Sequence, residues 1–266
     1  MTRSLLPPHS SATLQGNVFS RFFHYYANPG RFLHMATRVQ PYLTYSALFF
    51  TFIGLVWGLF FSPPDWQQGD TVRIMYVHVP TAILASSGYA ALALCGLFSL
   101  VWQHPLANLA AAEIGPVGAC ATALCLVTGS LWGKPMWGTY WVWDARLTSV
   151  LILFFLYLGH ISLIHAFEDQ QHGYQAAAIL ALAGVIDLPI IKFSVDWWNT
   201  LHQPDSITLT KAPTISSSML WPLAFSMVGF FLGFCAIVLA RLRAAILERR
   251  IRNLLFPSHR QPFNSR

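Results

Sequence analysis

Long apolar stretches separated by short polar connections dominate the chain from residue 42 to residue 241. Six of them have the length of about 20 residues that an α-helix needs to cross the hydrocarbon core of a bilayer. The fifth stretch is the weakest, because Asp187, Pro189 and Lys192 interrupt it. The pattern predicts an all-α integral membrane protein, a bundle of six transmembrane helices with outward-facing loops. The expected spans are residues 42–62, 79–102, 108–132, 147–168, 175–194 and 219–241.

The composition and the placement of charge agree with this pattern. Of 266 residues, 55% are hydrophobic and 10% charged, whereas soluble domains carry about 25% charged residues. Basic residues that flank membrane spans mark the cytoplasmic side. We therefore expect a cytoplasmic N-terminal tail at 1–41 and a basic cytoplasmic C-terminal tail at 242–266. The net charge of +6 then reflects topology, and no nucleic-acid partner is expected. Eleven arginines lie before the first stretch or from the end of the last one onward: Arg3, Arg21, Arg31, Arg38, Arg241, Arg243, Arg249, Arg250, Arg252, Arg260 and Arg266.

An even number of crossings places both termini on one side of the membrane. The connections at 63–78, 133–146 and 195–218 then share the opposite, outward side. They are longer than the connections at 103–107 and 169–174, and they hold most of the sequence's unusual residues. A binding site is therefore expected at the outward face, within the domain 42–241.

The central outward segment, residues 132–148, is rich in tryptophan: Trp132, Trp137, Trp141 and Trp143 lie within twelve residues. An aromatic belt at the membrane surface explains one or two of them, but poorly explains four with an embedded Asp144 and Arg146. If the segment is helical, Trp137, Trp141 and Asp144 share one face and form an apolar shelf for a planar ligand. Arg146 would pair with Asp144 or with an acidic ligand group, such as a haem propionate.

Two histidines flank this segment, His78 in MYVHVPTA and His202 in WWNTLHQP. Pro80 suits the first turn of a helix, so His78 is expected at the helix mouth. Two imidazoles from different loops make an axial pair for haem iron. The alternative is that each histidine caps a helix or lies at the wet interface. Other candidates are Met75 and Met136 as ligands, and Asp70, Asp196 and Asp205 as acceptors that orient the rings.

Charges and glycines within the spans lead to smaller predictions. Glu113 lies near a cytoplasmic helix end, where solvation accounts for it, while Asp187 either lines the outward pocket or serves structure alone. The pairs Gly54–Gly58 and Gly229–Gly233 each predict a close helix contact.

The motif W-G-x-x-W-x-W-D-x-R-L-T, from Trp137 to Thr148, resembles the WWD signature of the haem-handling proteins of cytochrome c biogenesis. Six spans, MYVHVP and WWNTLHQP make the chain similar to the CcmC family and unlike the larger WWD relatives CcmF and CcsA. The resemblance implies that haem b is held at the periplasmic face of the bacterial inner membrane, with His78 and His202 as iron ligands. Residues Trp132, Trp137, Trp141, Trp143, Asp144 and Arg146 would contact haem.

The resemblance also implies partners and a role. The haem chaperone CcmE would receive haem and bind it covalently, beside the ABC-transporter components CcmA and CcmB, the small protein CcmD and membrane lipid. The chain would be a presenting platform, not an enzyme with a catalytic residue. Two alternatives remain, a b-type haem electron-transfer protein and a haem transporter or ABC permease subunit. Broken helices near the bilayer midplane would favour the transporter, and only Asp187–Pro189 hints at one.

Overall fold

A computed structural model describes residues 27–104, 106–198, 200–202 and 212–256. Helices make up almost all of these residues, and no named strand occurs among them, so the all-α prediction is confirmed. The elements in chain order are α2 (Pro29–Val56), η1 (Trp57–Phe61), η2 (Asp70–Ile74), α3 (Met75–Trp102), α4 (Ala107–Trp137), α5 (Ala145–His165), α6 (Gln170–Gly184), α7 (Asp187–Trp197) and α8 (Ser217–Leu255).

Six helical spans are long and apolar enough to cross a membrane, which confirms the predicted number for the described part of the chain. The spans differ from the predicted ones mainly at their ends. The first begins at Pro29 because the Asn28 side chain accepts hydrogen bonds from the backbone N–H groups of Gly30 (2.8 Å) and Arg31 (3.3 Å). The last continues to Leu255. Of the predicted tails, residues 1–26 and 257–266 lie outside the described residues.

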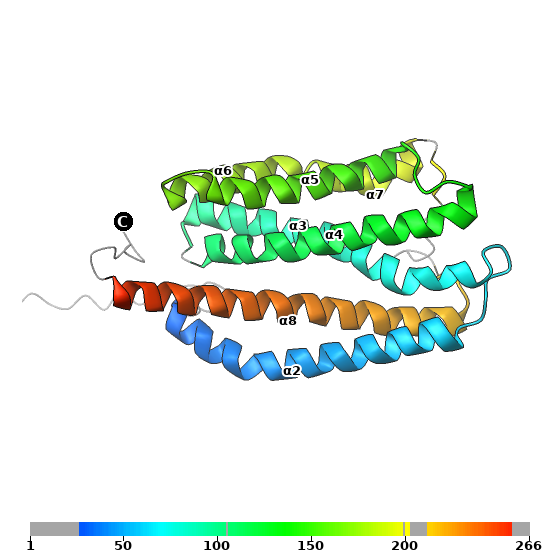
Figure 1. Ribbon diagram of the computed structural model, residues 1–266, viewed down its shortest axis with the longest axis horizontal. Helices are drawn as coiled ribbons and strands as arrows, with labels where there is room; N and C mark the ends of the chain where they lie inside the picture. The colour runs from blue at the N-terminus through cyan, green and yellow to red at the C-terminus, as the bar shows by residue number, and fades with distance from the viewer. Residues whose placement is uncertain (1–26, 105, 199, 203–211, 257–266) are drawn as a thin grey trace, which may run out of the picture.

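The helices pack as neighbouring pairs. Helix α2 lies along α8, α3 along α4, and α5 along α6 and α7 (Figure 1). Helix α2 begins and α8 ends at one end of the bundle, which we call the tail end. The ends of α2, α4 and α7 and the beginnings of α3, α5 and α8 lie at the opposite end, which we call the far end (Figure 1). The three segments predicted to share one face therefore gather at one end of the bundle.

Glycines bring α2 and α8 together. A Cβ atom on Gly54 would lie 2.4 Å from the Ser226 backbone nitrogen, and one on Gly229 would lie 2.3 Å from that of Thr51. These two positions confirm the predicted close helix contact. Gly58 instead faces the ring of Tyr76 in α3. Gly233 has more space, because the nearest atom to a Cβ added there would be the Cβ of Ala47, 4.0 Å away.

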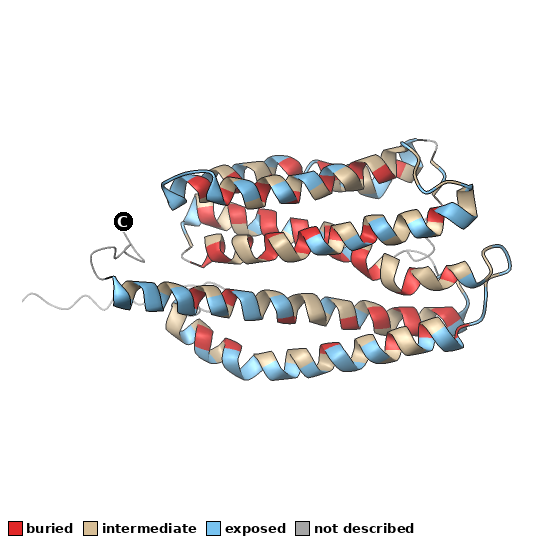
Figure 2. Cartoon of the chain, in the orientation of Figure 1, coloured by how far each residue is buried: buried red, intermediate tan, exposed pale blue. Residues whose placement is uncertain are grey.

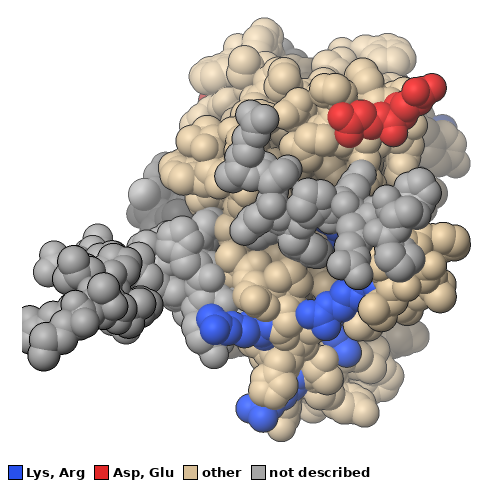
Figure 3. Space-filling view, turned by 90° about the vertical axis from the view of Figure 1, so that its left-hand side faces the viewer, with Lys and Arg blue, Asp and Glu red and all other residues tan. Residues whose placement is uncertain are grey.

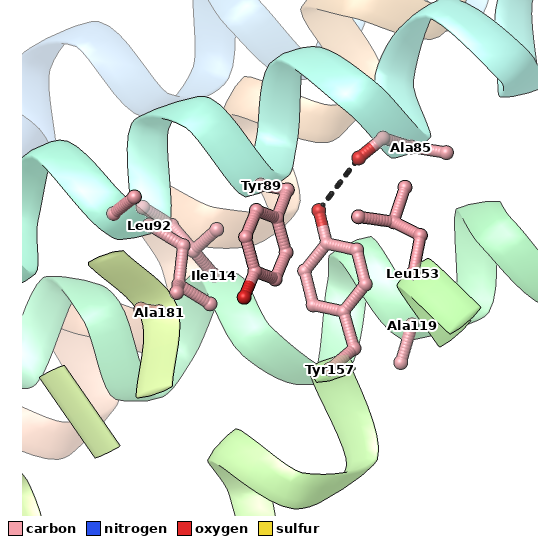
Figure 4. Packing of buried hydrophobic residues seen from close by; sticks show 9 residues of the cluster. Ala85, Tyr89, Leu92, Ile114, Ala119, Leu153, Tyr157 and Ala181 are labelled. Carbon is pink, nitrogen blue, oxygen red and sulfur yellow. Dashed lines mark hydrogen bonds between the residues drawn. The ribbon is translucent and has the colours of Figure 1, made fainter. Parts of the chain in front are cut away.

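The main apolar cluster lies between α3, α4, α5 and α6 (Figure 4). At its centre the rings of Tyr89 and Tyr157 meet edge to face, with centroids 5.1 Å apart. The Tyr157 hydroxyl donates to the Ala85 carbonyl (2.8 Å), so this buried polar group is satisfied. Figure 2 shows buried residues where helices face one another and many exposed residues on the outer surfaces, where lipid would cover apolar side chains.

Two acidic residues within the spans, Glu113 and Asp187, have largely buried side chains. The Glu113 carboxylate lies 2.9 Å from the Arg241 guanidinium and is 17% exposed, so the expectation that solvation accounts for it is wrong. Since the fifth span turns at residues 185–186, Asp187 begins α7 with a buried side chain. Figure 3 looks onto the tail end, where basic side chains gather over the half formed by α2 and α8.

Candidate functional site

His78 lies in the first part of α3, not at the end of a loop. The 3₁₀ turn of η2 passes directly into α3, so the helix begins at Met75 and Pro80 falls beyond its first turn. The prediction of a His78 at the very mouth of the helix is therefore wrong by about one turn. The Thr81 hydroxyl donates to the carbonyls of Val77 and His78 (2.9 Å each), beside the proline that has no N–H to donate.

The His78 ring is held by α4. Its Nδ1 atom lies 3.1 Å from the Cys125 carbonyl oxygen and 3.0 Å from the Thr128 hydroxyl. A carbonyl only accepts hydrogen bonds, so Nδ1 carries the proton and donates, and Nε2 keeps its lone pair. The ring also meets Trp132 edge to face at 5.7 Å, and the Trp132 indole donates to the Gln68 side chain at 2.8 Å.

Gly129 was missed by the sequence analysis. A Cβ atom at this position would lie 2.9 Å from Cε1 of His78, so only glycine leaves enough space for the His78 ring as it lies here. Cys125, Thr128, Gly129 and Trp132 follow one another at helical spacings of three, one and three residues, and therefore share one face of α4. Every helix has such a face, so the spacing alone gives no signal that would have singled out Gly129.

His202 is held in a similar way by the start of α5. Its Nδ1 lies 3.0 Å from Oδ2 of Asp144, whose side chain is 8% exposed. The other oxygen, Oδ1, accepts from the Leu147 backbone N–H (2.8 Å) and caps α5. The His202 ring meets Trp137 edge to face at 4.9 Å. Burial lowers the pKa of His202 from its ordinary value, while the hydrogen bond from His202 to Asp144 opposes that shift, so the neutral ring is favoured.

Asp144 is thus the acceptor that orients His202. The three candidates considered from sequence were Asp70, Asp196 and Asp205. Asp70 instead pairs with Arg73 at 3.2 Å, and Asp205 lies outside the described residues. Met75, considered as a rival ligand, is buried in an apolar cluster with Tyr76 and its neighbours.

The tryptophan-rich segment is not one helix. Helix α4 ends at Trp137 because Gly138 adopts a left-handed conformation (φ 77°), and α5 begins only after Asp144. The conditional prediction of a shared helical face for Trp137, Trp141 and Asp144 is therefore wrong. Instead Trp141 packs edge to face against Trp143 at 5.5 Å, and Trp143 is exposed. The buried Nε1 of Trp141 has no hydrogen-bond partner within the described ranges.

Arg146 lies in the first turn of α5, and its Nε donates to the Ser194 hydroxyl of α7 at 3.2 Å. Asp144 uses its two oxygens for His202 and Leu147. Arg146 therefore ties α5 to α7 two residues after Asp144, which contacts His202.

Together these elements bring His78 and His202 to the last part of α4, where one ring meets Trp132 and the other Trp137, at the far end of the bundle. In the part of the chain that the structure describes, Nε2 of either ring makes no hydrogen bond. Nor do those residues include a group of three or more His, Cys, Asp or Glu that would hold a bare metal ion. Haem brings four nitrogen ligands of its own, so two imidazoles with available Nε2 atoms suit it well.

Comparisons with known proteins agree with this chemistry. Residues 22–256 match the model of the family CcmC, described as "Heme exporter protein C". The heme exporter protein C of Bradyrhizobium diazoefficiens is 49% identical, over 90% of this chain and 91% of that protein. Those of Haemophilus influenzae and Escherichia coli K12 are 48% and 47% identical, over 86% and 84% of this chain and 93% and 90% of theirs.

Proposed function

Because the chain belongs to the CcmC family of haem exporter C proteins, we propose that it holds haem between His78 and His202 during cytochrome c maturation. One observation carries the proposal: both rings have Nδ1 tied to an acceptor that cannot donate, so both offer Nε2 to iron. Each ring is also fixed by its own tryptophan, Trp132 or Trp137. The cargo proposed is haem b, which needs no covalent bond to this chain.

The tryptophan-rich segment would receive the porphyrin edge and the partner that takes it. Trp141 and Trp143 form an aromatic rim in the stretch between Trp137 and Asp144, which both contact His202. The buried Nε1 of Trp141 supplies a donor for a haem propionate, and the Arg146 guanidinium supplies positive charge near both rings. We propose that the exposed side of this rim, with Trp143, is where the chaperone CcmE docks.

The chemical role of the chain is placement. Haem supplies a reactive vinyl group, and the chaperone supplies the histidine that attaches to it. This chain would fix the haem orientation, which lowers the entropic barrier without a catalytic residue of its own. It would act in the bacterial inner membrane with both termini cytoplasmic and the haem site periplasmic, beside CcmA, CcmB and CcmD. The arginines at the tail end support this orientation.

A second candidate, a haem permease, draws on the turn that divides the fifth span. Half-helices that meet inside the membrane are typical of transporters, and α6 and α7 meet at Asp187. However, Leu188 and Ile191 of α7 pack against the main apolar cluster. Uptake of haem into vesicles that contain the chain but lack the chaperone would favour the permease.

Replacing each ligand tests the proposal. We expect the purified variants His78→Ala and His202→Ala to lose the six-coordinate haem spectrum and much of the bound haem, measured as the pyridine haemochrome per protein. His172→Ala is the matched control, because His172 also lies 3.1 Å from an aspartate, Asp169, but at the tail end. Full haem content and an unchanged spectrum in both ligand variants would refute the proposal.

A further inference from the structure

The two candidate iron ligands differ in what holds their Nδ1 atoms. His202 donates to a carboxylate oxygen of Asp144 at 3.0 Å. His78 donates to neutral groups, the Cys125 carbonyl at 3.1 Å and the Thr128 hydroxyl at 3.0 Å. Hydrogen bonds to an ionised acceptor are roughly twice as strong as those between neutral groups. A carboxylate acceptor also makes the imidazole a more basic metal ligand.

We propose that His202 is the stronger iron ligand and that His78 is the one an incoming group displaces first, an inference that rests on haem binding between these two residues. The haem would then stay anchored through His202 while its other face opens. Asp144 acts as a positioning residue that sets the strength of His202.

The cap that Asp144 forms makes a clean test possible. Its Oδ1 accepts the Leu147 N–H at 2.8 Å, and its side chain is 8% exposed, so both oxygens are fixed. Asparagine is as good an N-cap as aspartate. Asp144→Asn therefore removes the charge and can keep the cap. Its single amide oxygen accepts either from the Leu147 N–H or from His202, so in both cases His202 loses its ionised acceptor.

The first experiment compares the ligands one at a time. In ferrous His78→Ala the iron is held by His202, and in ferrous His202→Ala by His78. Resonance Raman spectroscopy measures the iron–histidine stretching frequency, which rises with the basicity of the imidazole. We expect a higher frequency in His78→Ala, and a drop when Asp144→Asn is added to it. Equal frequencies, or the reverse order, would overturn the inference and leave haem binding itself intact.

The second experiment keeps both ligands, so it decides the matter even if the single-ligand variants lose haem. A more basic ligand stabilises ferric iron. We expect Asp144→Asn to weaken the preference of the site for ferric over ferrous haem about tenfold. This is the lower end of the effect of removing the carboxylate that orients a metal-binding histidine. For a one-electron couple that is a rise of about 59 mV in midpoint potential. An unchanged potential would overturn the inference.

Two controls isolate the charge on Asp144. Asp169→Asn alters a second aspartate that both caps a helix and contacts a histidine, but it lies at the α5–α6 connection. It is expected to leave the potential unchanged. Thr128→Val removes a neutral partner of His78 and is expected to shift the potential less than Asp144→Asn does. If the unaltered protein binds no haem at all, the proposed function fails before these comparisons apply.

Discussion

One face of α4 determines how the His78 ring lies. Cys125 and Thr128 accept its Nδ1–H, Trp132 meets it edge to face, and Gly129 leaves the space that it fills. The Cys125 carbonyl and the absent Cβ of Gly129 position the ring together with the side chains of Thr128 and Trp132. A conservative change at a residue of this face should therefore alter the position of His78, the proposed ligand.

Gly129→Ala is the sharpest test at this scale. The added Cβ would lie 2.9 Å from Cε1 of His78, so the ring must turn or move. We expect severalfold weaker haem binding in a titration of the apoprotein. The control is Gly233→Ala, where the nearest atom to the new Cβ is 4.0 Å away and no loss of affinity is expected. Equal affinities for both variants would contradict the structural account of His78.

The sequence predicted several residues of the candidate site but not how they are connected. His78 and His202 stood out because they flank the tryptophan-rich segment. Asp144 was recognised in the motif, yet its contact with His202 joins residues 58 positions apart, and no local pattern encodes such a contact. Aspartates nearer in sequence were therefore preferred. Gly129 was passed over because a glycine in a membrane helix is common and its neighbour was unknown.

At the scale of helices, the contact between α2 and α8 depends on glycine. Gly229 and Gly54 allow each backbone to approach the other helix more closely than a Cβ permits. Helix association in lipid depends on such packing, because lipid chains are as apolar as the side chains.

Gly229→Ala should push these helices apart, since the new Cβ would lie 2.3 Å from the Thr51 backbone nitrogen. We expect a loss of about 1–3 kcal/mol of stability, the usual cost of overpacking. Thermal unfolding in detergent would measure it, with Gly233→Ala as the well-tolerated neighbour one turn along α8. A melting temperature as high as that of Gly233→Ala would count against the contact.

Apolar length predicted the six spans well, but it could not place their ends. Hydrogen bonds made by single polar residues decide where the chain enters a helix. Asn28 starts α2 well before the apolar stretch, and Gly138 stops α4 within the tryptophan-rich segment. The division of the fifth span was signalled by Asp187 and Pro189, although the exact turn at 185–186 was not.

For the whole molecule, the alternating direction of the six spans is the decisive property, because it determines which segments share one end. Helices α2, α4 and α7 end at the far end, and α2 begins and α8 ends at the tail end (Figure 1). The site can form only because segments far apart in sequence return to one end.

Cysteine labelling tests the predicted orientation of the bundle. In a variant without the four native cysteines, we place single cysteines at the exposed positions Gln67 and Tyr140 of the far end, or Glu168 and Leu254 of the tail end. A membrane-impermeant maleimide is expected to label the first pair in intact cells and the second pair only after permeabilisation. The reverse pattern would place the site in the cytoplasm, and a mixed pattern would contradict the fold.

The tie between Arg146 and Ser194 has a consequence for repeated use of the site. Ser194 and His202 are both fastened to the beginning of α5, one through Arg146 and the other through Asp144. The stretch of chain between them is therefore a short closed ring, and closing a short ring costs little entropy. If haem binds there as proposed, His202 would stay tied to Asp144 when the haem leaves. The next haem would then meet a His202 ring that is already in position.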